Sequence, residues 1–174
     1  IERWAAIIQE KEIGLAEDQA RLQAEIQVFK LGAQFQFAEQ LLEEKRYLQA
    51  AKEFERIVDE DKRQSLKFAD KALYNAALAY QEVQYYDSAA RIYERIITET
   101  RFATSDFVED ALFRLAENHK KFFNFESAVQ TYLALVARNP KNKQSPYSLF
   151  EAARLLENDG KTQEAAQQYE KYSS

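Results

Sequence analysis

The 174-residue chain has no cysteine and a single histidine, His119. Without cysteine it can form no disulfide framework, thiol nucleophile, cysteine-ligated zinc site or iron–sulfur cluster. One histidine also excludes the paired-histidine zinc motif and any multi-histidine metal centre. We therefore predict no metal site and no cofactor.

Glycine and proline are almost as scarce, with three and two residues respectively. Tight turns between strands use these residues to reach a positive or a fixed φ. A sheet protein with many turns is therefore excluded, and an all-α chain is expected. We also expect its helix-to-helix turns to need little special φ.

Two further absences concern charge and hydropathy. The formal net charge is −5, whereas proteins that bind nucleic acid normally present a basic face to the phosphates, so no nucleic-acid partner is expected. No stretch approaches 18 uninterrupted apolar residues, so no transmembrane segment is predicted.

What the chain does contain is a repeat of about 39 residues. Ala50, Ala89, Ala128 and Ala165 follow one another at spacings of 39, 39 and 37 residues. Three further columns keep this register: an alanine twelve residues earlier (Ala38, Ala77, Ala116, Ala153), an aromatic four residues later (Phe54, Tyr93, Tyr132, Tyr169), and Tyr47, Tyr86, Phe125 and Thr162 three residues before. Such repetition is typical of solenoid architectures.

Within each copy, apolar residues at helical spacing mark two helices separated by a short polar break. The alanine columns fit the points where paired helices approach most closely. We predict an α-solenoid of four helix–turn–helix repeats over residues 31–174, at about 31–61, 66–100, 105–140 and 146–172. An N-terminal helix over residues 1–30 precedes them, either as a separate element or continuous with the first repeat helix. Ser65, Thr104 or Ser105, and Ser145 before Pro146 are the expected helix N-caps.

These columns resemble the tetratricopeptide repeat family over residues 31 to 172. The second copy is the best match, through Leu73, Ala77, Tyr80, Tyr86, Ala89, Tyr93 and Ile96. The third matches through Leu112, Ala116, Phe125, Ala128, Tyr132 and Pro140, and the first and fourth match less fully. The copies are longer than the usual repeat of about 34 residues. In this they resemble the subgroup associated with the bacterial envelope, which includes outer-membrane assembly lipoproteins and cell-division coordinators.

Residues 1 to 30 lack the repeat signature. Ile8, Leu15, Leu22 and Phe29 recur every seven residues, with Ile26 and Ala33 as companions, and no proline interrupts the helix pattern before Tyr47. The positions three residues after Ile8, Leu15 and Leu22 would complete a coiled-coil seam, but they hold the charged residues Lys11, Asp18 and Glu25. Only one of the two apolar positions of each heptad is therefore filled. The leading interpretation is a helix that packs on the first repeat or remains from a truncated upstream repeat; the alternative is a dimerising coiled coil.

Few residues offer chemistry. His119 occupies a first-helix column that holds Leu41, Tyr80 and Leu156 in the other copies, which indicates packing rather than base catalysis. Asp59, Glu60 and Asp61 begin like a calcium loop, but basic residues follow where oxygen ligands are needed, so a solvated charge run is expected. The three glycines are too scattered to cradle a phosphate. We predict that the protein is not an enzyme.

The resemblance implies a concave groove lined by first helices, with the fifth repeat position pointing into it. In this chain that position holds Phe35, Tyr74, Phe113 and Phe150. These aromatic side chains would give a peptide a large contact area, although the same rings could instead pack on the neighbouring repeat. Of the family's clamp for chaperone carboxylate tails, only Asn75 and Arg114 match, so that assignment is rejected. The candidate partner-binding residues are Phe35, Tyr74, Asn75, Phe113, Arg114, Lys120, Lys121, Phe150 and Arg154.

The favoured function is a protein-interaction scaffold whose groove binds a peptide segment or a protein partner. The alternative is a structural assembly subunit of a bacterial envelope complex, which oligomerises through the N-terminal helix or the convex face. A periplasmic or outer-membrane-associated bacterial location is favoured over a cytoplasmic one. Because the chain begins at Ile1 and contains no Met, we expect it to be a segment of a longer protein.

Overall fold

The computed structural model describes residues 2–173, apart from the side chains of residues 2–10, 12, 13 and 173. Eight α-helices and one short 3-10 helix follow in the described residues, and none of these residues forms a strand. The predicted all-α solenoid with a long N-terminal helix is confirmed. The bounds are α1 Glu2–Glu43, α2 Tyr47–Glu60, α3 Ala69–Glu82, α4 Tyr86–Thr98, η1 Thr100–Phe102, α5 Phe107–Lys121, α6 Phe125–Arg138, α7 Ser145–Asn158 and α8 Thr162–Ser173.

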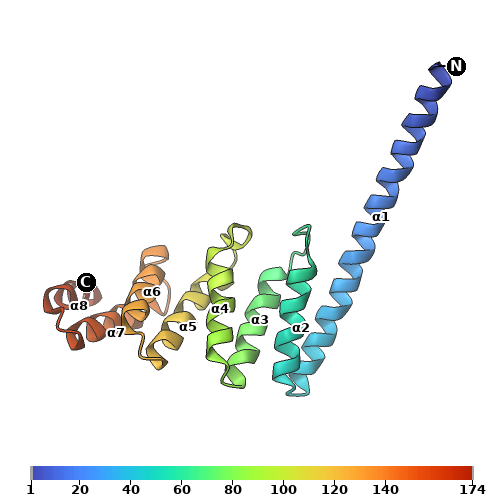
Figure 1. Ribbon diagram of the computed structural model, residues 1–174. Coiled ribbons are helices and arrows are strands. Elements are labelled where there is room, and N and C mark those ends of the chain that lie inside the picture. The colour runs from blue at the N-terminus through green and yellow to red at the C-terminus, as the bar shows by residue number, and fades with distance from the viewer. Residues whose placement is uncertain (1, 174) are drawn as a thin grey trace.

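The helices from the end of α1 onward pack as successive antiparallel hairpins, and each hairpin contacts the next (Figure 1). The alanine columns lie where neighbouring helices meet: Ala38, Ala77, Ala116 and Ala153 are fully buried, as are Ala50, Ala89 and Ala128. A methyl group at these positions allows close helix packing, because it adds little volume between the backbones.

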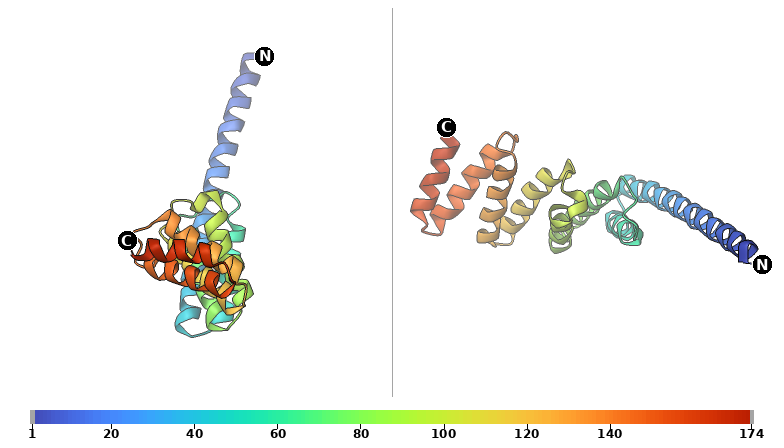
Figure 2. Two further views of the ribbon diagram at one scale, coloured as in Figure 1. Left: turned by 90° about the vertical axis from the view of Figure 1, so that its left-hand side faces the viewer. Right: turned by 90° about the horizontal axis from the view of Figure 1, so that it is seen from above.

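α1 is a single 42-residue helix, Glu2–Glu43, so the N-terminal helix continues into the first helix of the first repeat. Its C-terminal part packs on α2 through Leu31, Ala38 and Leu41. Its N-terminal part projects away from the solenoid, as the views in Figures 1 and 2 agree. The expectation that residues 1–30 pack on the first repeat is therefore wrong for Leu15, Leu22 and Phe29, which are exposed. Ile8 lies among the side chains that are not described.

The four hairpin turns share one backbone conformation. Lys45, Gln84, Phe123 and Gly160 have φ values of 58°, 62°, 59° and 77°. In each turn the amide after this residue donates to a carbonyl five residues earlier, the bond of a Schellman motif: for example Tyr85 to Tyr80 at 2.8 Å. The expectation that the turns need little special φ is wrong, because three of them force a side chain into the left-handed region where glycine is preferred.

Gln84→Gly is expected to raise the free energy of unfolding by about 0.5 kcal/mol. The change removes a left-handed penalty of about 1–2 kcal/mol but gives the unfolded chain more freedom. Urea unfolding measures the difference. A loss of stability on this substitution would contradict the strained turn.

The expected helix caps have different outcomes. The Ser105 hydroxyl accepts a bond from the Phe107 amide at 3.2 Å, whereas Ser145 is the first residue of α7, which has no side-chain cap bond. The loop before α3 is fixed by a buried carboxylate instead of a cap. α3 begins at Ala69, so Ser65 does not cap it. Instead Asp61 is 4% exposed, and its carboxylate accepts bonds from the Ser65 amide and hydroxyl and from the Leu66 amide, at 2.9, 3.0 and 3.1 Å. Asp61 therefore fixes the conformation of this loop, and the expectation that it belongs to a solvated charge run is wrong.

Candidate partner-binding face

The first helices of the hairpins form one layer, held together by side-chain bonds between repeats. The ammonium group of Lys71 on α3 lies 2.9 Å from the carboxylate of Glu39 on α1. Tyr74 on α3 donates to Asp110 on α5, and Lys120 on α5 donates to Glu151 on α7 at 3.1 Å. We call this surface of α1, α3, α5 and α7 the first-helix face.

The aromatic column at the fifth repeat position packs inside this layer. Each ring lies against the aromatic residue of the second helix of its own hairpin, in edge or tilted contact. The ring centroids are 5.2 Å apart for Phe35 and Phe54, 6.3 Å for Tyr74 and Tyr93, 6.3 Å for Phe113 and Tyr132, and 6.1 Å for Phe150 and Tyr169.

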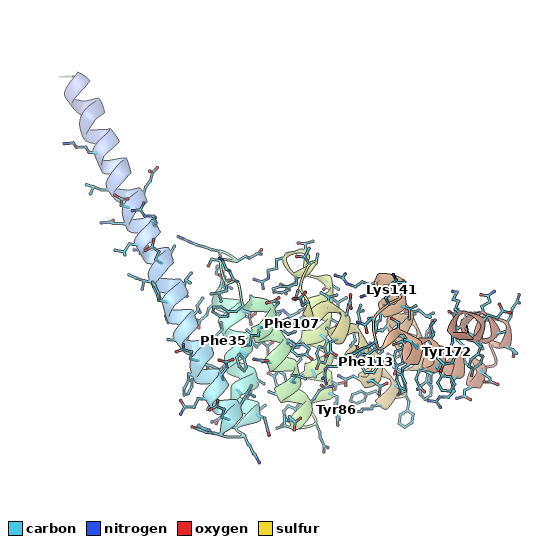
Figure 3. All side chains as sticks on the ribbon, turned by 180° about the vertical axis from the view of Figure 1, so that it is seen from behind. Phe35, Tyr86, Phe107, Phe113, Lys141 and Tyr172 are labelled. Atoms are coloured by element: carbon cyan, nitrogen blue, oxygen red, sulfur yellow. The ribbon has the colours of Figure 1, made fainter. Side chains whose placement is uncertain are left out.

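A third ring from the start of the next hairpin completes each of the first three contacts. Phe35 meets Phe68, Tyr74 stacks on Phe107, and Phe113 meets Tyr147, at 4.8, 4.7 and 5.8 Å. Figure 3 labels Phe35, Phe107 and Phe113 on α1 and α5. The family pattern does not single out this third column. Its signal was present, because Phe68, Phe107 and Tyr147 are 39 and 40 residues apart. The rings therefore link successive repeats.

This packing changes the expected role of the column. Phe35 is only 7% exposed, and Lys71 lies over its ring at 5.0 Å, so this side chain is not an open groove wall. Tyr74 and Phe113 are half-buried, and Phe150 is 39% exposed. Only the C-terminal end of the column offers an aromatic ring to a partner.

Two predicted site residues, Tyr74 and Arg114, meet on the carboxylate of Asp110. The Arg114 guanidinium donates to Asp110 at 2.6 Å and to the Tyr74 hydroxyl at 3.1 Å. Burial, helped by the bond to Asp110, raises the pKa of Tyr74 to about 12. Burial alone would raise the pKa of Asp110, but the bonds from Tyr74 and Arg114 hold it below its ordinary value. The cluster is thus neutral overall and fixed in place.

Lys120 and Arg154, two further predicted residues, are joined through Glu151. Lys120 donates to Glu117 at 2.8 Å and to Glu151 at 3.1 Å, and Arg154 donates to Glu151 at 2.7 Å. The Arg154 bond is the main cause that lowers the pKa of Glu151. These cations are therefore already paired, and a ligand anion would compete with carboxylates of the chain.

The other two predicted residues take no part in these clusters. Asn75 is half-buried on α3 beside Tyr74 in the chain. Lys121 is exposed, and its ammonium group lies over the ring of Tyr86, 4.9 Å from the centroid, at the turn end of the hairpins. The structure thus brings Tyr74 and Arg114 together at Asp110, and Lys120 and Arg154 together at Glu151. Lys121 lies apart from both clusters.

His119 packs at the end of α5, where burial lowers its pKa and Glu94 opposes the shift only in part. The folded protein thus favours the neutral imidazole, and the unfolded chain binds the proton more readily. Stability is therefore full above the unfolded value of about 6.5 and falls as the pH drops through the lower folded value.

We expect urea to unfold the protein more easily at pH of about 5.5 than at pH of about 8, with His119→Leu removing most of that difference. Leucine fits this column, since Leu41 and Leu156 occupy it in other repeats. An unchanged pH dependence in the variant would contradict the assignment, because His119 is the only histidine.

In the part of the chain that the structure describes, a cavity of about 420 Å³ lies between the α5–α6 and α7–α8 turns, and another of about 410 Å³ lies on α2. No group of three or more acidic or histidine side chains that could hold a metal ion occurs among the described residues. None of the described helices is long and apolar enough to cross a membrane. The face can act by contact, through partly exposed guanidinium groups and one aromatic ring.

The fold places the chain among the α-solenoids built of helical hairpins. The family model for the tetratricopeptide repeat matches residues 110–142, which contain most of α5 and α6. No curated protein sequence matches the chain.

Solved structures share this fold. Tetratricopeptide-like repeats of a Podosopora anserina kinesin light chain align with a TM-score of 0.58 at 19% identity, over 82% of this chain and 73% of that one. MamA aligns with a TM-score of 0.59 at 14% identity, over 82% and 75%. At these identities the likeness shows the fold, and proteins with this fold generally mediate protein–protein interaction.

Proposed function

We propose that the protein is an interaction scaffold that binds a peptide segment or a protein partner on the first-helix face, without a chemical step. One observation carries this proposal. Arg114 and Arg154 have side chains that are 38% and 44% exposed, and Asp110 and Glu151 hold them in fixed positions. Arg114 lies over the ring of Tyr74 at 5.9 Å, and Arg154 follows the exposed Phe150 by four residues on α7. Arginine and aromatic residues that are already ordered lose little conformational entropy when a partner binds.

A pull-down with the full chain from cells of the source organism tests this proposal. Arg114→Glu with Arg154→Glu is expected to lose the partner, while Lys52→Glu with Arg56→Glu on the exposed side of α2 keeps it. Retention by the Arg114 and Arg154 variant would contradict the proposal. Circular dichroism of both variants controls for folding.

A second candidate function rests on the exposed stripe of α1. Leu15, Leu22, Ile26 and Phe29 are 57–78% exposed, and their spacing of seven, four and three residues is that of a coiled-coil seam. We infer that the stripe pairs with a second copy of the chain in parallel. In that arrangement Glu25 of one helix lies beside Lys30 of the other, so the flanking charges attract.

This pairing would suit a structural assembly subunit of a bacterial envelope complex, in the periplasm or at the outer membrane. The repeat length of about 39 residues supports that location. Cell fractionation of the source organism tests it, and recovery of the protein in the cytoplasmic fraction alone would contradict it.

A further inference from the structure

A cluster of exposed aromatic side chains lies at the turn between α5 and α6, apart from the first-helix face. Phe122, Phe123 and Phe125 are 48%, 80% and 43% exposed. The Phe123 and Phe125 rings are 5.9 Å apart, and Phe122 contacts Tyr86 of the previous hairpin at 5.8 Å. A contiguous apolar surface of this kind marks a site of interaction more often than a single exposed side chain does.

Phe123 is also strained. Its φ is 59°, in the left-handed region, where the equivalent turns of the other repeats carry Lys45, Gln84 and Gly160. A bulky side chain is unfavourable in this conformation, and such strain is concentrated at binding and switch sites. Packing does not explain the phenylalanine, because its ring is the most exposed of the large apolar side chains described.

Beside this turn lies the cavity of about 420 Å³, between the α5–α6 and α7–α8 turns. Phe123 and Phe125 form one side, and the buried side chains Val129, Leu155 and Leu156 also line it. The volume lies within the range of ligand sites. The site therefore has room and apolar surface for an anchoring side chain.

The rim of the cavity is acidic. Glu126, Asp159 and Glu164 line it together with Lys161, and the Lys161 ammonium group pairs with Asp159 at 2.8 Å. Three carboxylates thus face one ammonium group that is already paired. A cationic group of a ligand at the rim could also make cation–π contacts with the Phe123 and Phe125 rings.

We propose that this cavity binds a peptide segment of another protein, in which an aliphatic or aromatic anchor is flanked by lysine or arginine. The anchor enters between Phe125 and Leu155, and the flanking cations face the rim carboxylates. This surface is separate from the first-helix face, so its failure would leave the function proposed above untouched.

Nuclear magnetic resonance of the ¹⁵N-labelled full chain tests the proposal with three synthetic peptides. The first has one leucine flanked by two lysines on each side; the second replaces the lysines by glutamates, and the third replaces the leucine by serine. Only the first is expected to shift the amide signals of residues 123–130 and 155–164, with a dissociation constant of about 1 mM or tighter.

Variants then separate the two parts of the site. Phe123→Gly is expected to weaken the lysine peptide by about fivefold or more without loss of stability, since glycine suits this φ. Glu126→Lys with Glu164→Lys is expected to abolish its binding. Gln84→Gly and Asp87→Lys, the equivalent positions of the second repeat for Phe123 and Glu126, serve as controls and should leave binding unchanged.

Four results would overturn the proposal. They are an absence of shifts with the lysine peptide, equal binding of the glutamate peptide, an affinity that neither Phe123→Gly nor the double charge reversal changes, and shifts of the same amides when the protein alone is concentrated. The last result would identify a second copy as the occupant.

Discussion

Tyr93→Ala is expected to lower the free energy of unfolding by about 4 kcal/mol, as for other large aromatic residues removed from a core. Tyr93 on α4 is fully buried, and its ring packs on Tyr74 in the middle of the solenoid. Its hydroxyl donates to Gln81 at 2.8 Å, and Gln81 in turn donates to Asn118 of the next hairpin at 2.8 Å. The substitution therefore opens a cavity and also disturbs a buried polar contact between two repeats.

Two control variants separate the contribution of the ring from that of the hydroxyl group and from that of an exposed ring. Urea unfolding measures the free energy of unfolding of all three variants. Tyr93→Phe keeps the ring and loses only the hydrogen bond, so a cost of about 1 kcal/mol is expected. Tyr85→Ala removes a ring that is 52% exposed and should change stability by about 0.5 kcal/mol or less. A loss below about 1 kcal/mol in Tyr93→Ala would contradict the stabilising role of the aromatic packing between the two helices of a hairpin.

Leu22→Glu is expected to convert a dimer into a monomer, so that light scattering reports half the mass of the unmodified chain. In a parallel pair Leu22 would lie opposite its counterpart, and two buried carboxylates facing each other would be strongly unfavourable. The measurement is made at about 100 μM protein, where a pair with micromolar affinity is almost fully formed.

Ala20→Glu is the matched control, because it adds the same charge two residues away on another side of the exposed helix. It should leave the mass unchanged. A monomeric unmodified chain would contradict the second candidate function, and so would equal masses for the unmodified chain and the Leu22 variant.

Much of the fold could be predicted from the sequence, because alanines and aromatics repeat in register. Ala38, Ala77 and Ala116 indicated the close helix contacts, and Phe54, Tyr93 and Tyr132 indicated the large side chains of the core. The left-handed turns could not be predicted, because lysine, glutamine and phenylalanine, the residues at 45, 84 and 123, rarely adopt a positive φ. The regular hydrogen bonds of the Schellman motif hold them there.

The candidate site was predicted less completely, because the sequence shows a column but not what covers it. The fifth-position aromatics are in register, yet Lys71 covers Phe35, and Phe107 stacks on Tyr74. Asp110 and Glu151 precede Arg114 and Arg154 by four and three residues, a helical spacing that the sequence does show. The bonds from Tyr74 to Asp110 and from Lys120 to Glu151 join different hairpins, so no local pattern announces them. The projection of the N-terminal part of α1 could not be predicted either. It depends on whether another element packs against this part of the helix, which the helix's own apolar pattern does not show.

The proposed function requires that a protein partner docks on the first-helix face. Hydrogen exchange of the full chain, with and without the partner captured in the pull-down, reports which helices the partner covers. Slower exchange is expected in α3, α5 and α7 around Tyr74, Arg114 and Arg154. Slower exchange confined to residues 11–30 of α1, or no change on these three helices, would contradict the proposed function.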